Sequence, residues 1–117
     1  MKRLVEIRTY QLKPGSGARF HDLVSTQSVP LLRAWGMEVV TYGRSLHAPD
    51  GYYLIRAYDD LAHLHASQDA FYASDAWRQG PREAIIELIL TDANAVLWLA
   101  PEAVDAIRRS GDPTAPL

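Results

Sequence analysis

Four histidines are the side chains of this sequence best suited to metal or proton chemistry. His63 and His65 form a His-x-His pair in a stretch whose apolar spacing is that of a helix. Residues two positions apart on a helix point roughly 200° apart, so this pair cannot chelate one metal ion. No His-Glu-x-x-His motif, acidic cluster or cysteine completes a metal site. We therefore expect no metal and no cofactor.

His65 is the histidine placed best for proton transfer. It shares a predicted helix face with Leu61 and Leu64, and Gln68 follows one turn later. Gln27 lies on the apolar face predicted for the first helix, so three polar side chains point from two helices towards the sheet. Two interpretations stay open: they bond to the backbone or to one another, or they converge on a small-molecule pocket. In such a pocket His65 is the candidate general acid or base, because its pKa lies near neutrality.

Aromatic side chains supply the other candidates for ligand contact. The sequence has six tyrosines and three tryptophans. Tyr10, Tyr42 and Tyr53 could line a cavity for a planar ligand, and Trp77 is a further ligand-binding candidate. Each has core packing as its alternative, because aromatic side chains bury a large apolar area.

The elements that must position these residues follow the order β-α-β-β-α-β. Alternating residues predict strands, and apolar residues three and four apart predict helices. We expect Pro30 to kink or split the first helix after Val29, and Gly80-Pro81 to interrupt the second helical region. The predicted strands span residues 4–12, 37–44, 52–58 and 95–99, the helices span 18–35 and a region from 61 onward, and a turn covers 92–94.

This order predicts a ferredoxin-like α+β fold, with helices on one face of a four-stranded antiparallel sheet. Residues 1–100 form the predicted domain, and 101–117 are expected to form a short helix and a frayed tail. The third and fourth strands carry apolar residues on both sides, and such a sheet needs a second cover. We therefore expect a homodimer that forms through the sheet face.

Glu6, Arg8 and Tyr10 share one side of the first strand, and Arg56 belongs to the neighbouring third strand. We predict a Glu6–Arg56 ion pair at or near the dimer interface. The alternative is an exposed pair that contributes little to stability.

The bulk composition excludes several classes of function. A net charge of −2 does not suit a nucleic-acid-binding protein, which needs a basic patch. No apolar run of about 18 residues spans a membrane, and the absence of any targeting signal makes the cytoplasm the expected location. No phosphate loop, G-x-G-x-x-G or G-x-S-x-G motif is present.

Three segments together resemble the NIPSNAP family. The sequence V-E-I-R-T-Y-Q-L-K-P-G at 5–15 is similar to the opening of NIPSNAP domains. Residues 53–61 look like their third strand and following helix cap, and residues 74–77 with 80–82 look like their tryptophan-containing segment. The likeness covers roughly residues 3–99 and implies a dimeric α/β barrel. The wider group of such barrels includes cofactor-independent monooxygenases, haem-degrading enzymes and structural proteins, so the fold does not determine the function.

Two functions therefore stay open. In the first, a homodimeric barrel binds a small aromatic or lipophilic ligand and acts as a cofactor-independent oxygenase-like enzyme, with His65 taking the proton and tyrosines orienting the ring. In the second, the protein is a non-enzymatic interaction or structural module, and formation of the dimer is its function.

Overall fold

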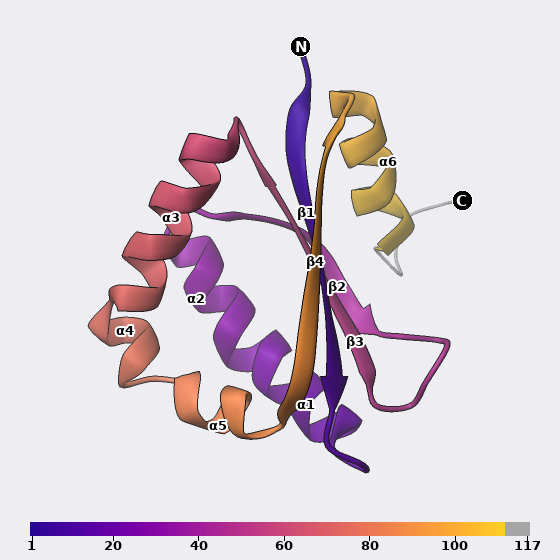
Figure 1. The fold of residues 1–117 in the computed structure, drawn as a ribbon, viewed down its shortest axis with the longest axis vertical. Helices are drawn as coiled ribbons and strands as arrows, with labels where there is room; N and C mark the ends of the chain where they lie inside the picture. The colour runs from indigo at the N-terminus through magenta and orange to yellow at the C-terminus, as the bar shows by residue number, and fades with distance from the viewer. Residues whose placement is uncertain (112–117) are drawn as a thin grey trace.

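The centre of the molecule is a four-stranded antiparallel sheet in the order β2-β3-β1-β4 (Figure 1). The computed structural model describes residues 1–111. This topology confirms the predicted ferredoxin-like α+β fold. The strands are β1 (Arg3–Leu12), β2 (Glu38–Arg44), β3 (Gly51–Tyr58) and β4 (Ile89–Leu99).

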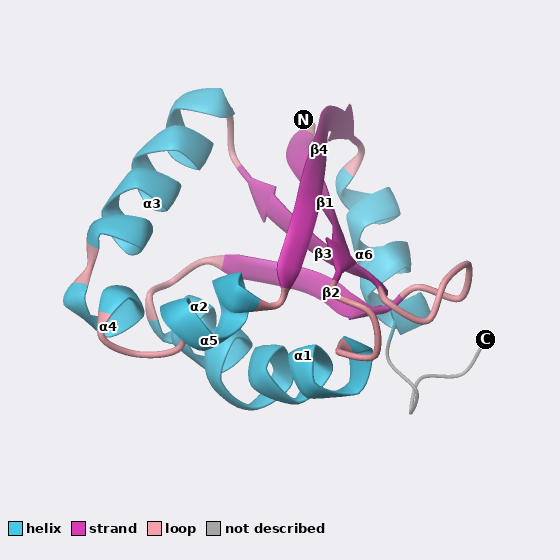
Figure 2. Cartoon of the chain, turned by 60° about the horizontal axis from the view of Figure 1, so that its bottom comes forward, coloured by secondary structure: helices cyan, strands magenta, loops and turns pink. Residues whose placement is uncertain are grey.

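All helical segments between β1 and β2 and between β3 and β4 lie on one face of the sheet (Figure 2). Asp60 begins the second group by accepting a 2.8 Å hydrogen bond from the His63 amide, and Ser74 caps the next segment through the Trp77 amide. The segments are α1 (Gly17–Leu23), the π-helical η1 (Val24–Ser28), α2 (Val29–Ala34), α3 (Leu61–Ala73), α4 (Asp75–Arg78) and α5 (Arg82–Glu87).

A π turn, rather than a break, accommodates Pro30. The Val29 amide bonds to the Val24 carbonyl, five residues earlier, and Pro30 then lies in the first turn of α2. Proline has no amide hydrogen, so the regular bonding pattern cannot continue through it. The chain widens one turn before the proline and stays helical past Val29, so the predicted split after Val29 is wrong. The irregularity expected near Pro30 takes the form of this π turn.

The fourth strand begins at Ile89, well before its predicted start, and the predicted turn at 92–94 was wrong. Asp92 pairs with Tyr10 of β1, and Asn94 pairs with Arg8. Polar residues such as Asp and Asn are typical of turns. Here the backbone pairing with β1 overrides that preference, and both side chains belong to the helix-facing side of the strand.

Two cores lie on opposite faces of the sheet. The larger core joins the helices to Leu4, Leu12, Leu54 and Tyr58. The smaller core lies under α6 (Pro101–Gly111), where Val104 packs with residues of three strands. The helix predicted to follow Pro101 is confirmed, and it covers part of the face on which a second sheet was expected. The remaining predicted tail, 112–117, lies outside the described residues.

Within residues 1–111, no helix combines the length and the hydropathy that crossing a lipid bilayer requires.

Candidate functional site

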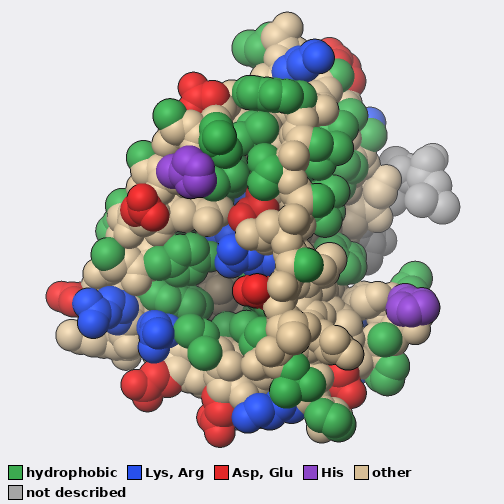
Figure 3. Space-filling model, in the orientation of Figure 1, with side chains coloured by type: hydrophobic (Ala, Val, Ile, Leu, Met, Phe, Trp, Pro, Cys, Tyr) green, Lys and Arg blue, Asp and Glu red, His purple; other side chains and the backbone are tan. Residues whose placement is uncertain are grey.

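A cavity of about 560 Å³ opens between the helix layer and the sheet. Figure 3 shows this hollow beside β4, with charged side chains at its floor and hydrophobic side chains around them. Its size and mixed lining are those of small-molecule sites. Its lining comprises Arg8, Tyr10, Phe20, Val24, Ser28, Leu32, Tyr52, Leu54, Gln68, Asp69, Phe71, Tyr72, Trp77, Arg82, Ile85, Ile86, Ile89 and Asp92.

A buried ion pair supports the floor of this cavity. Arg56 Nε donates to Glu6 Oε1 at 2.8 Å, and Arg56 Nη2 lies 2.7 Å from the same oxygen. The two side chains are 0% and 1% exposed. The predicted Glu6–Arg56 pair is therefore confirmed, but it faces the helices along with Leu4 and Tyr58. The pair was expected at or near the dimer interface on the open face of the sheet, but Glu6 and Arg56 point to the helix-covered face, where they contact Gln68 and Tyr72.

Gln68 holds the second oxygen of the same carboxylate. Its Nε2 donates to Glu6 Oε2 at 3.0 Å and to the Tyr58 hydroxyl at 3.1 Å. Burial raises the pKa of Tyr58, so this hydroxyl stays neutral. Both oxygens of Glu6 are thus engaged from within the chain, by Arg56 and by Gln68.

Arg8 lies next to this pair and lines the cavity. Its Nε donates to Asn94 Oδ1 at 2.9 Å, and its Nη1 lies 3.5 Å from the Tyr72 hydroxyl. Its Nη2 is 3.8 Å from Glu6 Oε2, which is beyond hydrogen-bond distance. Two guanidinium groups therefore share one carboxylate at the floor.

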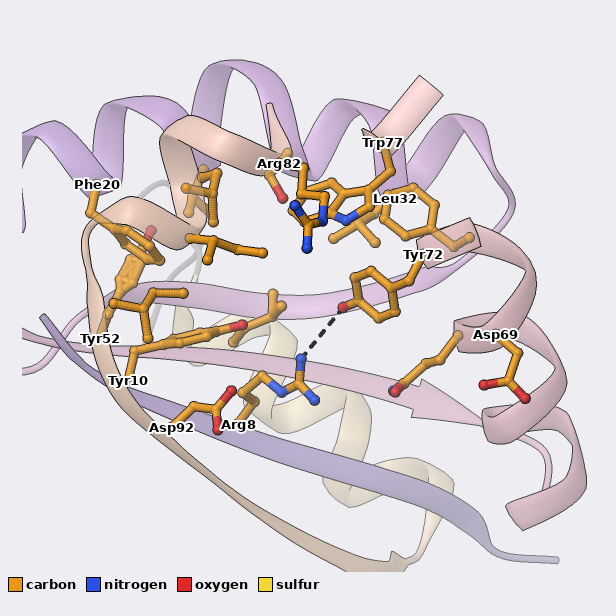
Figure 4. Close-up of a pocket in the computed structure, with 18 residues that line it drawn as sticks. Arg8, Tyr10, Phe20, Leu32, Tyr52, Asp69, Tyr72, Trp77, Arg82 and Asp92 are labelled. Atoms are coloured by element: carbon orange, nitrogen blue, oxygen red, sulfur yellow. Dashed lines mark hydrogen bonds between the residues drawn. The ribbon is translucent and has the colours of Figure 1, made fainter. Parts of the chain in front are cut away.

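The Tyr72 hydroxyl links the two arginines. Besides Arg8, it accepts a 2.9 Å hydrogen bond from Arg56 Nη1. A phenol oxygen that accepts from two donors still has its own proton to donate. Within residues 1–111 no side chain or carbonyl accepts that proton. Figure 4 shows the Tyr72 ring and the Arg8 guanidinium pointing towards each other inside the cavity.

Tyr10 adds a neutral polar group to the same wall. Burial raises the pKa of Tyr10 to about 12, against the opposing effect of Arg8. The phenol therefore keeps its proton at neutral pH and can orient a ligand through a hydrogen bond, without contributing a charge.

The roof of the cavity is apolar and aromatic. Trp77 packs against Phe71 and Tyr72 with ring centroids 5.5 Å apart in both pairs. Ser28, at the end of the π turn, is buried and lines the cavity, which matches the frequent occurrence of π turns at functional sites. Arg82 extends from α5 into the cavity from the side opposite the sheet (Figure 4).

Three of the predicted ligand-binding residues line the cavity, namely Tyr10, Gln68 and Trp77. Gln27 is exposed, because the π turn directs Ser28 inwards in its place. Tyr42 is half-buried beside the His21 ring and outside the cavity. Tyr53 belongs to the opposite face of the sheet, since it alternates with the cavity residue Tyr52.

His65, the predicted general acid or base, is exposed and does not line the cavity. The inward side of α3 is formed by Leu64, Gln68, Phe71 and Tyr72, whose spacing is that of one helix face. His65 follows Leu64 directly and is rotated away from it by about 100°.

Five residues of the site and its floor were not predicted from the sequence, namely Arg8, Tyr72, Arg82, Asp92 and Asn94. One signal was available for Arg8. It lies on the same side of β1 as Leu4 and Leu12, which belong to the larger core, and a charged residue on the core side of a strand needs a partner. No comparable signal identified Asn94, because its position had been interpreted as a turn.

Among residues 1–111, no group of three histidine, aspartate or glutamate side chains is placed to hold a metal ion.

Comparison with known proteins relates this chain to a family. A model of the NIPSNAP family matches residues 5–103. A NIPSNAP family protein of unknown function from Agrobacterium tumefaciens has a similar structure, with 24% identity, a TM-score of 0.76, and coverage of 84% of this chain and 88% of that one. An uncharacterized NIPSNAP domain protein from Burkholderia xenovorans has 19% identity and a TM-score of 0.75, over 84% of this chain and 95% of that one.

A more distant likeness concerns a putative antibiotic biosynthesis monooxygenase from Nitrosomonas europaea. It has 14% identity and a TM-score of 0.61, and the match covers 80% of this chain and 95% of that one. At this identity the likeness establishes the fold alone. The comparison with curated proteins gives no match.

Proposed function

This chain belongs to the NIPSNAP family, and on that premise we propose that it binds a small aromatic or lipophilic molecule in the cavity between α3–α5 and the sheet. The observation that carries the proposal is the cavity itself. About 560 Å³ lies under aromatic and aliphatic side chains and over a hydrogen-bonded polar floor. Small-molecule sites are clefts of roughly 300–1,000 Å³ lined by apolar side chains and a few polar groups, so an open cavity of this size and lining supports an occupant better than it supports a purely structural role.

The polar floor supports the same proposal. Burying ions is costly, and apolar residues of similar volume are often at least as stabilising as a buried ion pair. A chain that served only as a structural module would gain little from Glu6, Arg8 and Arg56 under an apolar roof. Polar groups at the end of an apolar pocket instead fix the orientation of a bound molecule.

We also propose that the protein acts as a homodimer that covers β4. Every residue between its ends is exposed, and Val96, Leu97 and Trp98 are 43%, 38% and 50% exposed. The strand is also an edge of the sheet, and an exposed apolar edge favours association. Because α6 already packs on one face of the sheet, this proposal concerns β4 and the uncovered part of that face.

A second candidate function is a cofactor-independent oxygenase-like activity in the same cavity. Asp69 and Asp92 line the cavity and offer carboxylates that could accept a proton from the substrate, a role that the position of His65 does not suit. The substrate anion would hold its negative oxygen near Arg8 and transfer electrons to dioxygen as a carbon–oxygen bond forms. The resulting peroxide anion would take back the proton held by the aspartate, which gives a hydroperoxide. Consumption of dioxygen after a substrate is added would distinguish this activity from binding alone.

Native mass spectrometry of the protein as purified tests the main proposal. We expect a dimer that carries additional small-molecule mass. Ile86→Trp fills the cavity from a half-exposed position, and it should remove that mass. Leu61→Trp is the matched control, because Leu61 is 51% exposed, close to the 45% of Ile86, and does not line the cavity.

Either of two outcomes counts against the proposal. Retention of the mass by Ile86→Trp would show that the molecule binds elsewhere. A protein without bound mass, which also fails to bind naphthalene-based probes, would favour the structural module. A monomer at micromolar concentration would contradict the dimer separately.

A further inference from the structure

We infer that the cavity selects organic molecules with one acidic oxygen, and that Arg8 and Tyr72 bind that oxygen while the apolar roof holds the rest of the molecule. The expected ligand class is a monoanion such as a carboxylate or an enolate on an aromatic or aliphatic body. This inference rests on the proposed function, since it specifies what the same cavity binds.

The balance of charge at the floor gives the first argument. Glu6 is engaged by Arg56 at 2.7 Å and by Gln68 at 3.0 Å. The nearest contact between Arg8 and this carboxylate is 3.8 Å. Among Glu6, Arg8 and Arg56, the positive charges outnumber the carboxylates by one, and the Arg8 side chain is only 18% exposed. A buried cation without a close partner is unfavourable, and an anion in the cavity would supply that partner.

The other carboxylates of the cavity do not neutralise Arg8 directly. Asp69 and Asp92 both line the cavity. In the part of the chain that the structure describes, neither lies within 4.0 Å of a basic nitrogen. Asp92 lies on β4 opposite Tyr10, on the same side of the sheet as Arg8, and Asp69 lies on α3 (Figure 4). Both restrict the ligand to a single negative group, because a second anionic group near them would be repelled.

The directions of the donors give the second argument. Arg8 Nη1 has only a 3.5 Å contact with the Tyr72 hydroxyl, and its Nη2 forms no hydrogen bond with Glu6. The Tyr72 hydroxyl accepts a 2.9 Å hydrogen bond from Arg56 and lies 3.5 Å from Arg8 Nη1. No described residue accepts the proton of this hydroxyl, which is free to point into the cavity. A guanidinium beside a phenol donor matches the two lone-pair directions of a carboxylate oxygen or an enolate.

Arg82 gives a third, independent contribution at the mouth. Its guanidinium extends into the cavity opposite Arg8 and Tyr72 (Figure 4). It is exposed, so its expected effect is attraction of the anion rather than a strong direct contact.

A pair of probes that differ only in charge tests the inference. Isothermal titration calorimetry at low ionic strength compares 2-naphthoate with its neutral analogue 2-naphthamide. We expect naphthoate to bind the wild-type protein about tenfold more tightly or better. Arg8→Met should remove most of that preference, and Tyr72→Phe should reduce it by about three- to tenfold while retaining the ring contacts.

Two arginine variants at exposed positions of the helix layer complete the design. Arg82→Gln should weaken naphthoate binding by about two- to threefold, and Arg19→Gln, on α1 and outside the cavity, should have no effect. Should Arg8→Met fail to fold, the wild-type comparison and Tyr72→Phe still decide the question.

The outcomes separate this inference from the function on which it rests. Equal affinity of the wild-type protein for both probes would overturn the charge selectivity and leave ligand binding in place. Binding of neither probe at millimolar concentration would count against both. A preference for naphthoate that survives in Arg8→Met and Tyr72→Phe would place the acidic group elsewhere and overturn the assignment.

Discussion

The two faces of the sheet are built from the same strands, yet they differ in what lies between the sheet and its cover. On the α6 side, Val5, Val40, Ala57 and Val104 are all at most 4% exposed and form a small apolar core. On the other side, a large apolar core surrounds a cavity with a charged floor. Successive residues of each strand point to opposite faces of the sheet, so neighbouring residues lie in different environments. One face of the sheet therefore provides packing alone, whereas the other combines packing with chemistry.

The largest loss of stability is expected when the buried Glu6–Arg56 pair of the floor is disrupted. Arg56→Met leaves Glu6 buried without its cation, and removal of one partner of a buried pair costs about 3–5 kcal/mol of unfolding free energy. Urea denaturation followed by circular dichroism measures this loss. The double variant Glu6→Leu with Arg56→Met should recover most of it. A loss below about 1 kcal/mol for the single variant would mean that water reaches the pair and screens it.

A smaller effect is expected from the apolar face. Val104 is 2% exposed, and Val104→Ala should lower the free energy of unfolding by about 1–3 kcal/mol through lost burial and the resulting cavity. Naphthoate affinity should stay unchanged, because the sheet separates Val104 from the ligand cavity. Denaturation and calorimetry on the same preparation provide the two measurements. A fall in naphthoate affinity as large as that of Tyr72→Phe would show that both faces of the sheet contribute to ligand binding.

Tyr72→Phe tests what a single hydroxyl contributes on the charged face. The ring keeps its contacts with Phe71 and Trp77, and the lost hydroxyl costs about 0.5–1.5 kcal/mol of stability. Ligand affinity should fall by a larger factor than the stability loss alone would explain. Thermal unfolding with and without naphthoate measures both effects. A variant that is less stable but retains full affinity would assign the hydroxyl a purely structural role.

The smallest effect is a pH dependence at the edge of α6. Burial raises the pKa of Glu38, but hydrogen bonds and positive charges from Arg3 and Arg108 outweigh it and hold the pKa below its ordinary value of 4.5. A carboxyl whose pKa is lowered in the folded state contributes stability above its unfolded pKa, and this contribution disappears as the pH falls through the folded value.

The Glu38 contribution is modest, because this side chain is 34% exposed and solvent screens such pairs to less than about 1 kcal/mol. Amide hydrogen exchange in α6 should accelerate slightly as the pH falls from about 5 towards 3, after correction for intrinsic exchange rates. Glu38→Gln should remove this dependence. An equal acceleration in that variant would attribute the acid sensitivity to another group.

The fold was predictable from the sequence, because alternation and helical spacing report burial directly. The cavity was predictable only in part. α3 carries polar and apolar residues around much of its circumference, so His65 and Gln68 both looked compatible with an inward position. Only the packing of Leu64 and Phe71 against the sheet decides between them. β4 was shortened in the prediction because Asp92 and Asn94 have polar side chains at positions where an edge strand faces an open cavity.

The π turn between α1 and α2 has a consequence for every residue that follows it. At about 100° per residue, a regular helix would place Leu32 roughly 120° around the axis from Phe20. Both side chains nevertheless lie against the sheet, with exposures of 2% and 1%. The wide turn absorbs one residue and restores the rotational phase of the second half of the helix. Deletion of one residue within Val24–Ser28 would therefore convert the wide turn into a regular one and keep Leu32 on the cavity side, whereas a regular helix through all of the present residues would turn it away. The shape of the roof thus depends on the wide turn itself.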